Sequence, residues 1–444
     1  MNIAYSARRA LRRYPLLGIL LSVVFVAFLM PAASAATKLK TLYSFCEQEN
    51  CADGSGPFEG LVEDGSGDLY GTTQQGGINQ AGVLFELEFT GSKYRYRRLY
   101  NFCPKAGCAD GADPNANLIL DTNGNLYGTT QSGGSAFNSG TAFELMPNAD
   151  RSKWKLITLY VFCTKIDCGD GTQPSGGLSY QGMQTGALYD GTSPLYGTTY
   201  RGFPGGADAG IAFELTNVSG KTRRKEKVLV AFCGTDQCSA GIHPKGGLLP
   251  DSAGNLYGTT TTDESQSGPG SVYELTPTHD GVTETVLYKF CQLQGCADGK
   301  NPAWSLAWGA QGHLFGISSA GGAFSNGAVF EIAPNGAESQ ESVVYSFCAL
   351  DACADGASPV RGVTVDSNGD LFGTTFAGGA VNKGIAFKIS GKKESVLRSF
   401  CSEAACADGA NPAGGIILGR TGNLFGTTSS GGANNGGSAF KLTP

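Results

Sequence analysis

Residues 102–130 read FCPKAGCADGADPNANLILDTNGNLYGTT, and this pattern returns along almost the whole chain. Its first part is a Phe-Cys-x4-Cys string with a proline six residues after the second cysteine. Seven copies use all 14 cysteines: Cys46 and Cys51, Cys103 and Cys108, Cys163 and Cys168, Cys233 and Cys238, Cys291 and Cys296, Cys348 and Cys353, Cys401 and Cys406. The matching prolines are Pro57, Pro114, Pro174, Pro244, Pro302, Pro359 and Pro412. Such regular self-similarity defines a tandem repeat.

Each repeat predicts four short strands. An apolar stretch follows the proline, and an Asp-x-x-Gly-Asn turn (121–125) leads to the second strand, Leu-Tyr-Gly-Thr-Thr (126–130). A Gly-Gly loop precedes the third strand (141–145), and a variable loop precedes a fourth strand that ends at the next cysteine, as at 99–102. The strands are rich in β-branched and aromatic residues, with turn formers between them. No segment beyond the first 35 residues shows a long helical period, so we expect almost no helix.

Seven units of four antiparallel strands predict an all-β protein, a seven-bladed β-propeller. A β-solenoid would use shorter units with fewer strands. The repeat region (36–444) opens with a strand of the fourth type at 42–45 and ends just after one of the third type at 439–442. We therefore predict that the N-terminal strand completes the last blade, which removes an open sheet edge.

Residues 1–35 have the features of a secretory signal peptide. Four arginines (Arg8, Arg9, Arg12 and Arg13) precede an apolar run at 16–30, and Ala33-Ser34-Ala35 supplies a small-x-small cleavage pattern. An uncleaved membrane anchor is the alternative, but the run is shorter than the roughly 20 residues that a span needs. The sequence therefore predicts an exported protein, located outside the cell, at its surface or in the periplasm, with no stable membrane span after cleavage.

The charge balance argues against a nucleic-acid partner. The chain carries a formal net charge of −6, and loss of the four signal arginines with no acidic residue lowers it to −10. No basic excess remains to neutralise phosphates.

Three roles compete for the cysteine pairs. A zinc site needs four ligands, usually from two close pairs, whereas here each blade holds one pair. A redox centre usually has two intervening residues, and seven copies would be unusual. A local disulfide needs only an oxidising compartment, which export supplies. We therefore predict seven disulfides within the pairs, which stiffen their loops, and no metal or cofactor.

Topology places the cysteine loops and the Gly-Gly loops on one face, so we expect ligand binding there. An Asp recurs after the second cysteine, and Ala240 replaces it in the fourth unit. This Asp either caps its own loop or contributes to a ring of carboxylates around the channel mouth. The positions are Asp53, Asp110, Asp170, Asp298, Asp355 and Asp408.

The fifth repeat departs most from the pattern. It contains Trp304 and Trp308, and His313 replaces the turn Asn or Asp. We predict that Trp304 lies near the cysteine-loop face as a platform for a sugar, with Asp298 and Asp355 as further binding residues. The alternative is that both tryptophans only fill blade packing. We expect His313 on the opposite face, away from Trp304.

The strings DTNGNLYGTTQSGG (121–134), DSNGDLFGTTFAGG (366–379) and TGNLFGTTSSGGANNGGSAFKLTP (421–444) resemble the GloVer tandem repeat, and the resemblance covers nearly all of residues 41–444. It implies a bacterial exported or cell-surface protein but no established activity, so no catalytic residue carries over. The family name refers to varied C-terminal anchors, whereas this sequence ends within the repeat. Anchoring, free secretion and periplasmic residence therefore all stay open.

Two main functions remain. The first is a non-enzymatic binding or surface-interaction module that holds a glycan or a protein through the cysteine-loop face. The alternative is a secreted glycoside hydrolase or polysaccharide lyase with acidic residues at the channel mouth. A purely structural surface role is a third possibility. No nucleophile motif is present, and the three histidines fall in different units, so we predict no catalytic residue.

Overall fold

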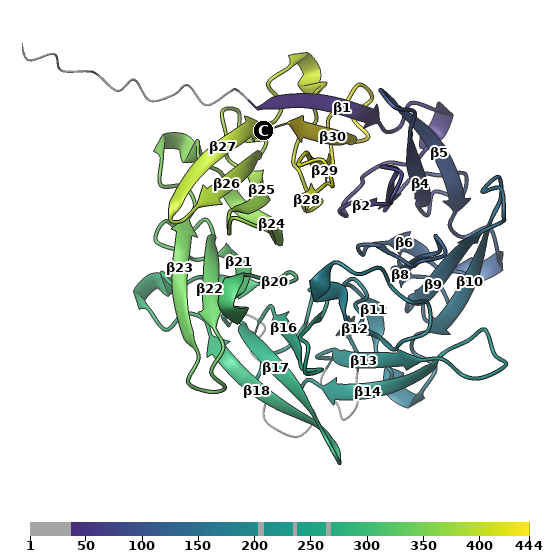
Figure 1. Ribbon diagram of the computed structural model, residues 1–444, viewed down its shortest axis with the longest axis horizontal. Helices are drawn as coiled ribbons and strands as arrows, with labels where there is room; N and C mark the ends of the chain where they lie inside the picture. The colour runs from purple at the N-terminus through teal and green to yellow at the C-terminus, as the bar shows by residue number, and fades with distance from the viewer. Residues whose placement is uncertain (1–36, 203–207, 234–237, 263–267, 444) are drawn as a thin grey trace, which may run out of the picture. The chain divides into compact units, whose positions relative to one another are not determined.

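The computed structural model describes residues 37–202, 208–233, 238–262 and 268–443. From Thr37 onward the chain forms one compact unit of seven antiparallel sheets, which stand around a central axis like the blades of a propeller (Figure 1). The predicted seven-bladed β-propeller is therefore confirmed. The signal peptide predicted at 1–35 lies outside the described residues, so its boundary stays a prediction.

The blades follow one another in chain order around the ring. From the innermost strand outward, blade one consists of β2 (Val62–Glu63), β3 (Leu69–Thr73), β4 (Val83–Phe89) and β5 (Tyr94–Asn101), and blade two of β6 (Ala112–Pro114) with β7 (Ile119–Leu120), β8 (Leu126–Ser132), β9 (Thr141–Pro147) and β10 (Trp154–Val161). In the same order, blade three consists of β11 (Thr172–Pro174), β12 (Leu195–Arg201), β13 (Ile211–Thr216) and β14 (Lys225–Ala231), and blade four of β15 (Leu249–Pro250), β16 (Leu256–Thr260), β17 (Ser271–Thr278) and β18 (Gly281–Lys289). Blade five consists of β19 (Lys300–Pro302) with β20 (Ala307–Trp308), β21 (Leu314–Ala320), β22 (Ala328–Ala333) and β23 (Gln340–Ser346), blade six of β24 (Ala357–Val365), β25 (Leu371–Ala377), β26 (Ile385–Ser390) and β27 (Lys393–Ser399), and blade seven of β28 (Ile417–Leu418), β29 (Leu424–Thr428), β30 (Ser438–Thr443) and β1 (Lys38–Ser44).

Helical structure in the described residues is confined to single 3-10 turns. Most of them lie in the cysteine loops. They are η1 (Glu49–Cys51), η2 (Ala106–Cys108), η3 (Ile166–Cys168), η4 (Met183–Thr185), η5 (Gln294–Cys296), η6 (Ala310–Gly312), η7 (Asp351–Cys353) and η8 (Ala404–Cys406).

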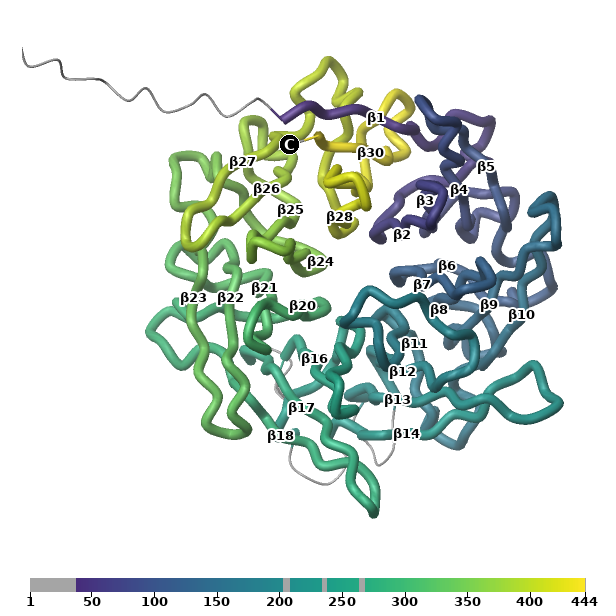
Figure 2. The backbone as a smooth tube through the Cα atoms, in the orientation of Figure 1, coloured from purple at the N-terminus to yellow at the C-terminus, as the bar shows by residue number. Residues whose placement is uncertain are grey.

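Both ends of the described chain meet in blade seven. Strand β1 pairs antiparallel with β30, in a register that sets Leu39 opposite Leu442 and Thr41 opposite Phe440. In Figure 2 the purple start of the tube runs along its yellow end. The backbone amide of Gly56 also donates to the carbonyl of Gly436 at 2.9 Å, which joins blade one to blade seven. The prediction that the N-terminal strand completes the last blade is confirmed.

Aromatic pairs fill the space between neighbouring blades. The phenylalanine before each first cysteine is at most 3% exposed and packs on an aromatic ring from the third strand of the next blade. Burial of one such side chain contributes roughly 1.5–3 kcal/mol. The ring centroids lie 4.9–5.4 Å apart in Phe45–Phe85, Phe102–Phe143, Phe162–Phe213, Phe232–Tyr273, Phe290–Phe330, Phe347–Phe387 and Phe400–Phe440.

This packing explains the glycine in Leu-Tyr-Gly-Thr-Thr. A Cβ on Gly128 would lie 2.8 Å from Cζ of Phe143, closer than two carbon atoms can approach without a shift. The following threonine can link two blades, since the hydroxyl of Thr198 donates to the carbonyl of Gly246 at 2.8 Å. The repeat motif thus encodes the contact between blades as well as the strand itself.

Candidate functional site

The cysteine loops and the Gly-Gly loops share one face, which we call the cysteine-loop face. Each near pair of cysteines forms a disulfide, with Cα atoms 3.9–4.1 Å apart, as the repeat spacing predicts. The amide of Gly77 donates to the carbonyl of Cys51 at 2.9 Å, so the Gly-Gly loop rests on the cysteine loop. Five blades repeat this contact, which confirms that both loops emerge at the same face.

The repeated Asp supports its own loop. Asp355 is completely buried and accepts hydrogen bonds from the amides of Ala349 (2.8 Å) and Leu350 (3.1 Å) and from the Tyr345 hydroxyl (2.8 Å). Asp298 is equally buried and has equivalent partners in its own blade. A ligand on the cysteine-loop face does not reach these carboxylates unless the loop opens. The geometry therefore favours the loop-capping alternative over a carboxylate ring.

The cysteine loop between blades three and four lacks both this carboxylate and its tyrosine donor. Ala240 stands in place of the Asp, and Val230 stands where most other blades have the tyrosine that donates to it. Both side chains belong to one apolar cluster in the structure. The carboxylate and its hydroxyl donor are thus lost together, which avoids a buried polar group without a partner.

Trp304 lies in the innermost part of blade five, between β19 and β20, where it meets side chains from other blades. The guanidinium carbon of Arg361 lies 4.1 Å from the centre of the Trp304 ring, a cation–π contact. Arg361 also forms an ion pair of 2.6 Å with Glu59. With Lys245, whose ammonium is 6.0 Å from the same ring, these residues form what we call the channel cluster. They come from blades one, four, five and six.

Arg361 holds the channel cluster together. Its Nε donates to the carbonyl of Ala413 at 3.1 Å and its Nη2 to Oδ1 of Asn115 at 3.2 Å. Burial raises the pKa of Glu59 to about 7, and the charge of Arg361 opposes that shift. A cavity of about 150 Å³ adjoins Arg361, and its lining residues are mostly glycines and aliphatic residues, with Asn117, Ser305 and Thr364 as further polar residues.

Sequence reasoning found Trp304 but missed its partners. The partners could have been found by comparing the second residue after the repeat proline in all seven units. This residue is alanine or glycine at positions 116, 176, 246 and 414. Glu59, Trp304 and Arg361 occupy the same position in the other units and are the large exceptions. Asp298 and Asp355 make their polar contacts within their own loops and not with Trp304.

A larger cavity, about 550 Å³, opens on the opposite face between blades four and five, and we call it the blade 4–5 cavity. Its wall includes Trp308 and His313, both departures of the fifth repeat, beside Tyr257 of blade four. Blade three adds Gln184 from the turn η4, and Gln311 follows from η6. His313 thus lies on the face that the topology predicted.

The aromatic wall of the blade 4–5 cavity is fixed by its neighbours. Nε1 of Trp308 donates to the carbonyl of Pro250 at 3.0 Å, and the ring meets Tyr257 edge-on with centroids 5.2 Å apart. The Tyr257 hydroxyl in turn donates to Glu274 at 3.0 Å. Nδ1 of His313 is 2.6 Å from Oε1 of Glu331. Little ordering entropy remains to be lost on this wall when a ligand binds.

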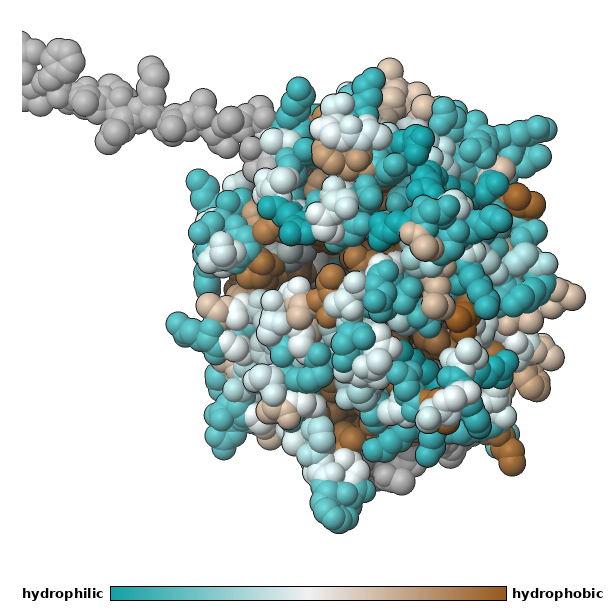
Figure 3. Space-filling model, turned by 45° about the vertical axis from the view of Figure 1, so that its right-hand side comes forward, coloured by the Kyte–Doolittle hydropathy of each residue, from teal (hydrophilic) through white to brown (hydrophobic). Residues whose placement is uncertain are grey.

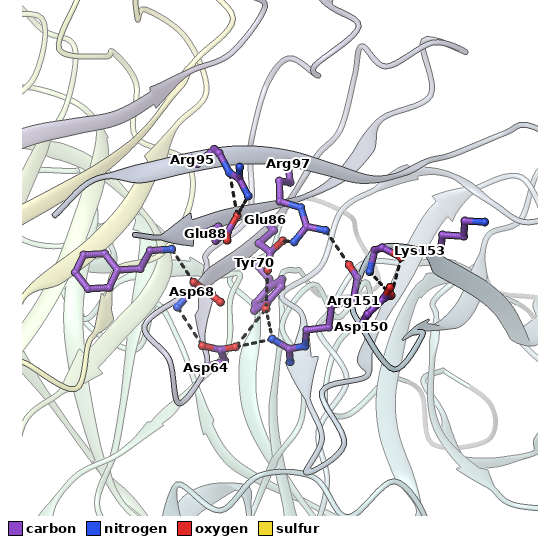
Figure 4. A network of polar contacts seen from close by, with 12 residues as sticks. Asp64, Asp68, Tyr70, Glu86, Glu88, Arg95, Arg97, Asp150, Arg151 and Lys153 are labelled. Atoms are coloured by element: carbon purple, nitrogen blue, oxygen red, sulfur yellow. Dashed lines mark hydrogen bonds and ion pairs between the residues drawn. The ribbon is translucent and has the colours of Figure 1, made fainter. Parts of the chain in front are cut away.

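Blades one and two show a different surface on that face. Arg151, from the loop between β9 and β10, reaches Asp64 and the hydroxyl of Tyr70 in blade one, each at 3.3 Å (Figure 4). Arg97 forms an ion pair of 2.7 Å with Glu86 beside them. Polar contacts cover the junction of these blades, whereas blades four and five leave a cavity. Figure 3 shows hydrophilic residues over most of one face of the molecule, with apolar residues in its recesses.

Residues 37–202, 208–233, 238–262 and 268–443 contain neither a cluster of metal-binding side chains nor a membrane-spanning helix. In those ranges no three His, Cys, Asp or Glu side chains come close enough to hold a metal ion. Within the same described part of the chain, no helix is long and apolar enough to cross a membrane.

The chain matches the model of the Gloeobacter/Verrucomicrobia repeat at residues 28–194 and 181–354, more than half of its length. None of the curated proteins matches it. Among solved structures it resembles the extracellular domain of BT3049 of B. thetaiotaomicron, described as a hybrid two component system, at 13% identity and a TM-score of 0.52, over 92% of this chain and 41% of that one. It also resembles PorZ, a surface component of the type-IX secretion system of Porphyromonas gingivalis, at 13% identity and a TM-score of 0.50, over 87% and 46%. The chain spans less than half the length of both proteins, and at this identity the likeness concerns the fold alone.

Proposed function

This chain belongs to the Gloeobacter/Verrucomicrobia repeat family, and from that premise we propose that it is an exported, non-enzymatic binding module whose ligand is a carbohydrate held in the blade 4–5 cavity. Seven disulfides support export, because such bonds persist in oxidising compartments. We place the ligand in this cavity rather than on the cysteine-loop face, since the carboxylates considered there are buried.

The observation that carries this proposal is the wall of Trp308 in a cavity of about 550 Å³. Ligand pockets for small molecules span roughly 300–1,000 Å³ and combine apolar walls with a few polar groups. A sugar ring has an apolar face that stacks on an aromatic side chain. The amide side chains of Gln184 and Gln311 line the same cavity and supply both donors and acceptors for hydroxyl groups.

A glycan array probed with residues 37–444, produced in an oxidising compartment with all disulfides formed, tests the proposal. We expect a defined set of neutral glycans to bind. Trp308→Ala should weaken that binding up to roughly tenfold, because an aromatic stacking contact contributes about 0.5–1.5 kcal/mol. Phe137→Ala removes an aromatic ring that is 75% exposed elsewhere and serves as the matched control.

Equal binding by the Trp308→Ala protein, with an unchanged unfolding midpoint, would place the ligand outside this cavity. Absence of any bound glycan would overturn the carbohydrate proposal altogether. The glycans that bind should also be incubated with the protein and examined for new reducing ends. The appearance of new reducing ends would show that the protein is a glycoside hydrolase and not a binding module.

A further inference from the structure

Lys245 is a mostly buried cation of the channel cluster that has no anionic partner. It follows Pro244 in blade four, and its ammonium lies 5.4 Å from the ring centre of Tyr200 and 6.0 Å from that of Trp304. In the described parts of the chain no carboxylate forms an ion pair with it. Burial lowers the pKa of Lys245, and the nearby positive charge of Arg361 lowers it further.

The charges around Lys245 leave a positive surplus. Glu59 is the buried carboxylate of the channel cluster, and Arg361 already occupies it at 2.6 Å. On the cysteine-loop side, Arg201 and Asp208 form their own ion pair of 3.1 Å. Burial lowers the pKa of His243, which favours its neutral form. Two cations, Lys245 and Arg361, therefore face the Trp304 ring, and the one carboxylate of the channel cluster, Glu59, is paired with Arg361.

A second donor in the channel cluster also lacks an acceptor. Nε1 of Trp304 is buried and has no hydrogen-bond partner among the described residues. A buried donor without a partner costs about 1–3 kcal/mol, and a buried charge without one costs more. One ligand with two acceptor oxygens and one negative charge would satisfy both the indole and the ammonium.

We propose that the channel cluster binds a small monocarboxylate, which forms an ion pair with Lys245 beside the Trp304 ring. A single negative charge matches the single unpaired cation, whereas a phosphate dianion would need a second one, and Glu59 already neutralises Arg361. This site is separate from the blade 4–5 cavity. It does not depend on whether that cavity binds carbohydrate.

Isothermal titration with acetate and with glucuronate, at constant ionic strength, tests the proposal on residues 37–444. Glucose and inorganic phosphate are the neutral and dianionic comparisons. We expect saturable binding of at least one carboxylate and markedly weaker binding of both comparisons. Lys245→Met should weaken the carboxylate roughly thirtyfold or more, because it removes the charged partner of a desolvated anion.

Lys105→Met is the matched control, since it removes an exposed lysine from the cysteine loop of blade two and should leave affinity unchanged. Lys245→Arg keeps the charge and should retain part of the binding. Carboxylate affinity that is the same in the Lys245→Met protein would overturn the proposal. So would the absence of binding by both carboxylates in the folded wild-type protein.

Discussion

Arg361 of blade six and Glu59 of blade one, the two blades that flank blade seven, form an ion pair with a separation of 2.6 Å. Their side chains are only 9% and 3% exposed. Arg361 also donates to Ala413 of blade seven and to Asn115 of blade two, so one guanidinium contacts three other blades, seven, one and two, where the ring closes. A buried pair of this kind adds little net stability over an apolar pair of similar volume, but removal of one partner alone is strongly destabilising.

Removing one member of this pair should be costly. We expect Arg361→Met to lower the free energy of unfolding by about 3–5 kcal/mol at pH 8, because it leaves a buried carboxylate without its partner. At pH 5 the loss should be smaller, since Glu59 is then protonated in the folded protein. The double variant Glu59→Gln, Arg361→Met should lose less than Arg361→Met alone at pH 8. Urea unfolding measures all three, and equal losses at both pH values would contradict this account.

Glu341 gives the propeller a second dependence on pH. Burial, with the charge of Asp298 adding to it, raises the pKa of Glu341 from 4.5 to about 7. The folded protein therefore binds a proton more tightly than the unfolded chain, and stability falls as pH rises through the window from about 4.5 to 7. Because the side chain is partly exposed, the effect should be about 1 kcal/mol.

Glu341→Gln should therefore stabilise the protein at pH 8 and have little effect at pH 4, as thermal melts at both pH values would show. Glu338→Gln is the control, because Glu338 is exposed in the turn before β23. Destabilisation by Glu341→Gln at pH 8 would show that the charged form of Glu341 is the one that the fold favours.

The disulfides should differ in importance between blades. In blade six, Asp355 caps the loop independently of Cys348 and Cys353, so replacing both cysteines by serine should cost about 2 kcal/mol at most. In blade four, Ala240 provides no such cap, and replacing Cys233 and Cys238 should cost more. Urea unfolding of the two variants, with far-UV circular dichroism to confirm an intact sheet, tests this order. An equal or reversed order would contradict a structural role for the Asp.

Strand β1 should control the oligomeric state. A chain that begins at Cys46 lacks β1 and exposes the edge of β30, including Phe440 and Leu442, which are otherwise completely buried. Open edges of this kind pair with other chains. We expect self-association and a lower melting temperature, measured by size exclusion with light scattering. A chain that begins at Thr37 should stay monodisperse, and monodisperse behaviour of both would contradict the role of β1.

The fold could be predicted from the sequence because each structural element corresponds to a short motif that repeats along the chain. The Phe-Cys pairs, the Asp-x-x-Gly turns and the Leu-Tyr-Gly-Thr-Thr strands each identify themselves within a few residues. The two strand types at the ends of the repeat region were sufficient to predict that β1 joins β30.

The candidate site was less visible because its parts come from different blades. Glu59 and Arg361 come into contact only after the ring closes. The sequence around either residue therefore does not predict that it pairs with the other. The Asp of the cysteine loop was ambiguous for another reason: a carboxylate that caps backbone amides and one that binds a ligand look the same in a sequence. Only the complete burial of Asp298 and Asp355 separates the two roles.

The pairing of β1 with β30 also constrains how the molecule assembles and comes apart. The first strand to emerge during synthesis has no partner until the last strand is available, so the ring closes late, and the loop-closure entropy for this contact falls on the final step. Such long-range pairing slows folding. Conversely, neither β1 nor β30 can detach without disrupting blade seven. We therefore expect slow unfolding and a long lifetime of the native state, governed by the rate at which blade seven opens.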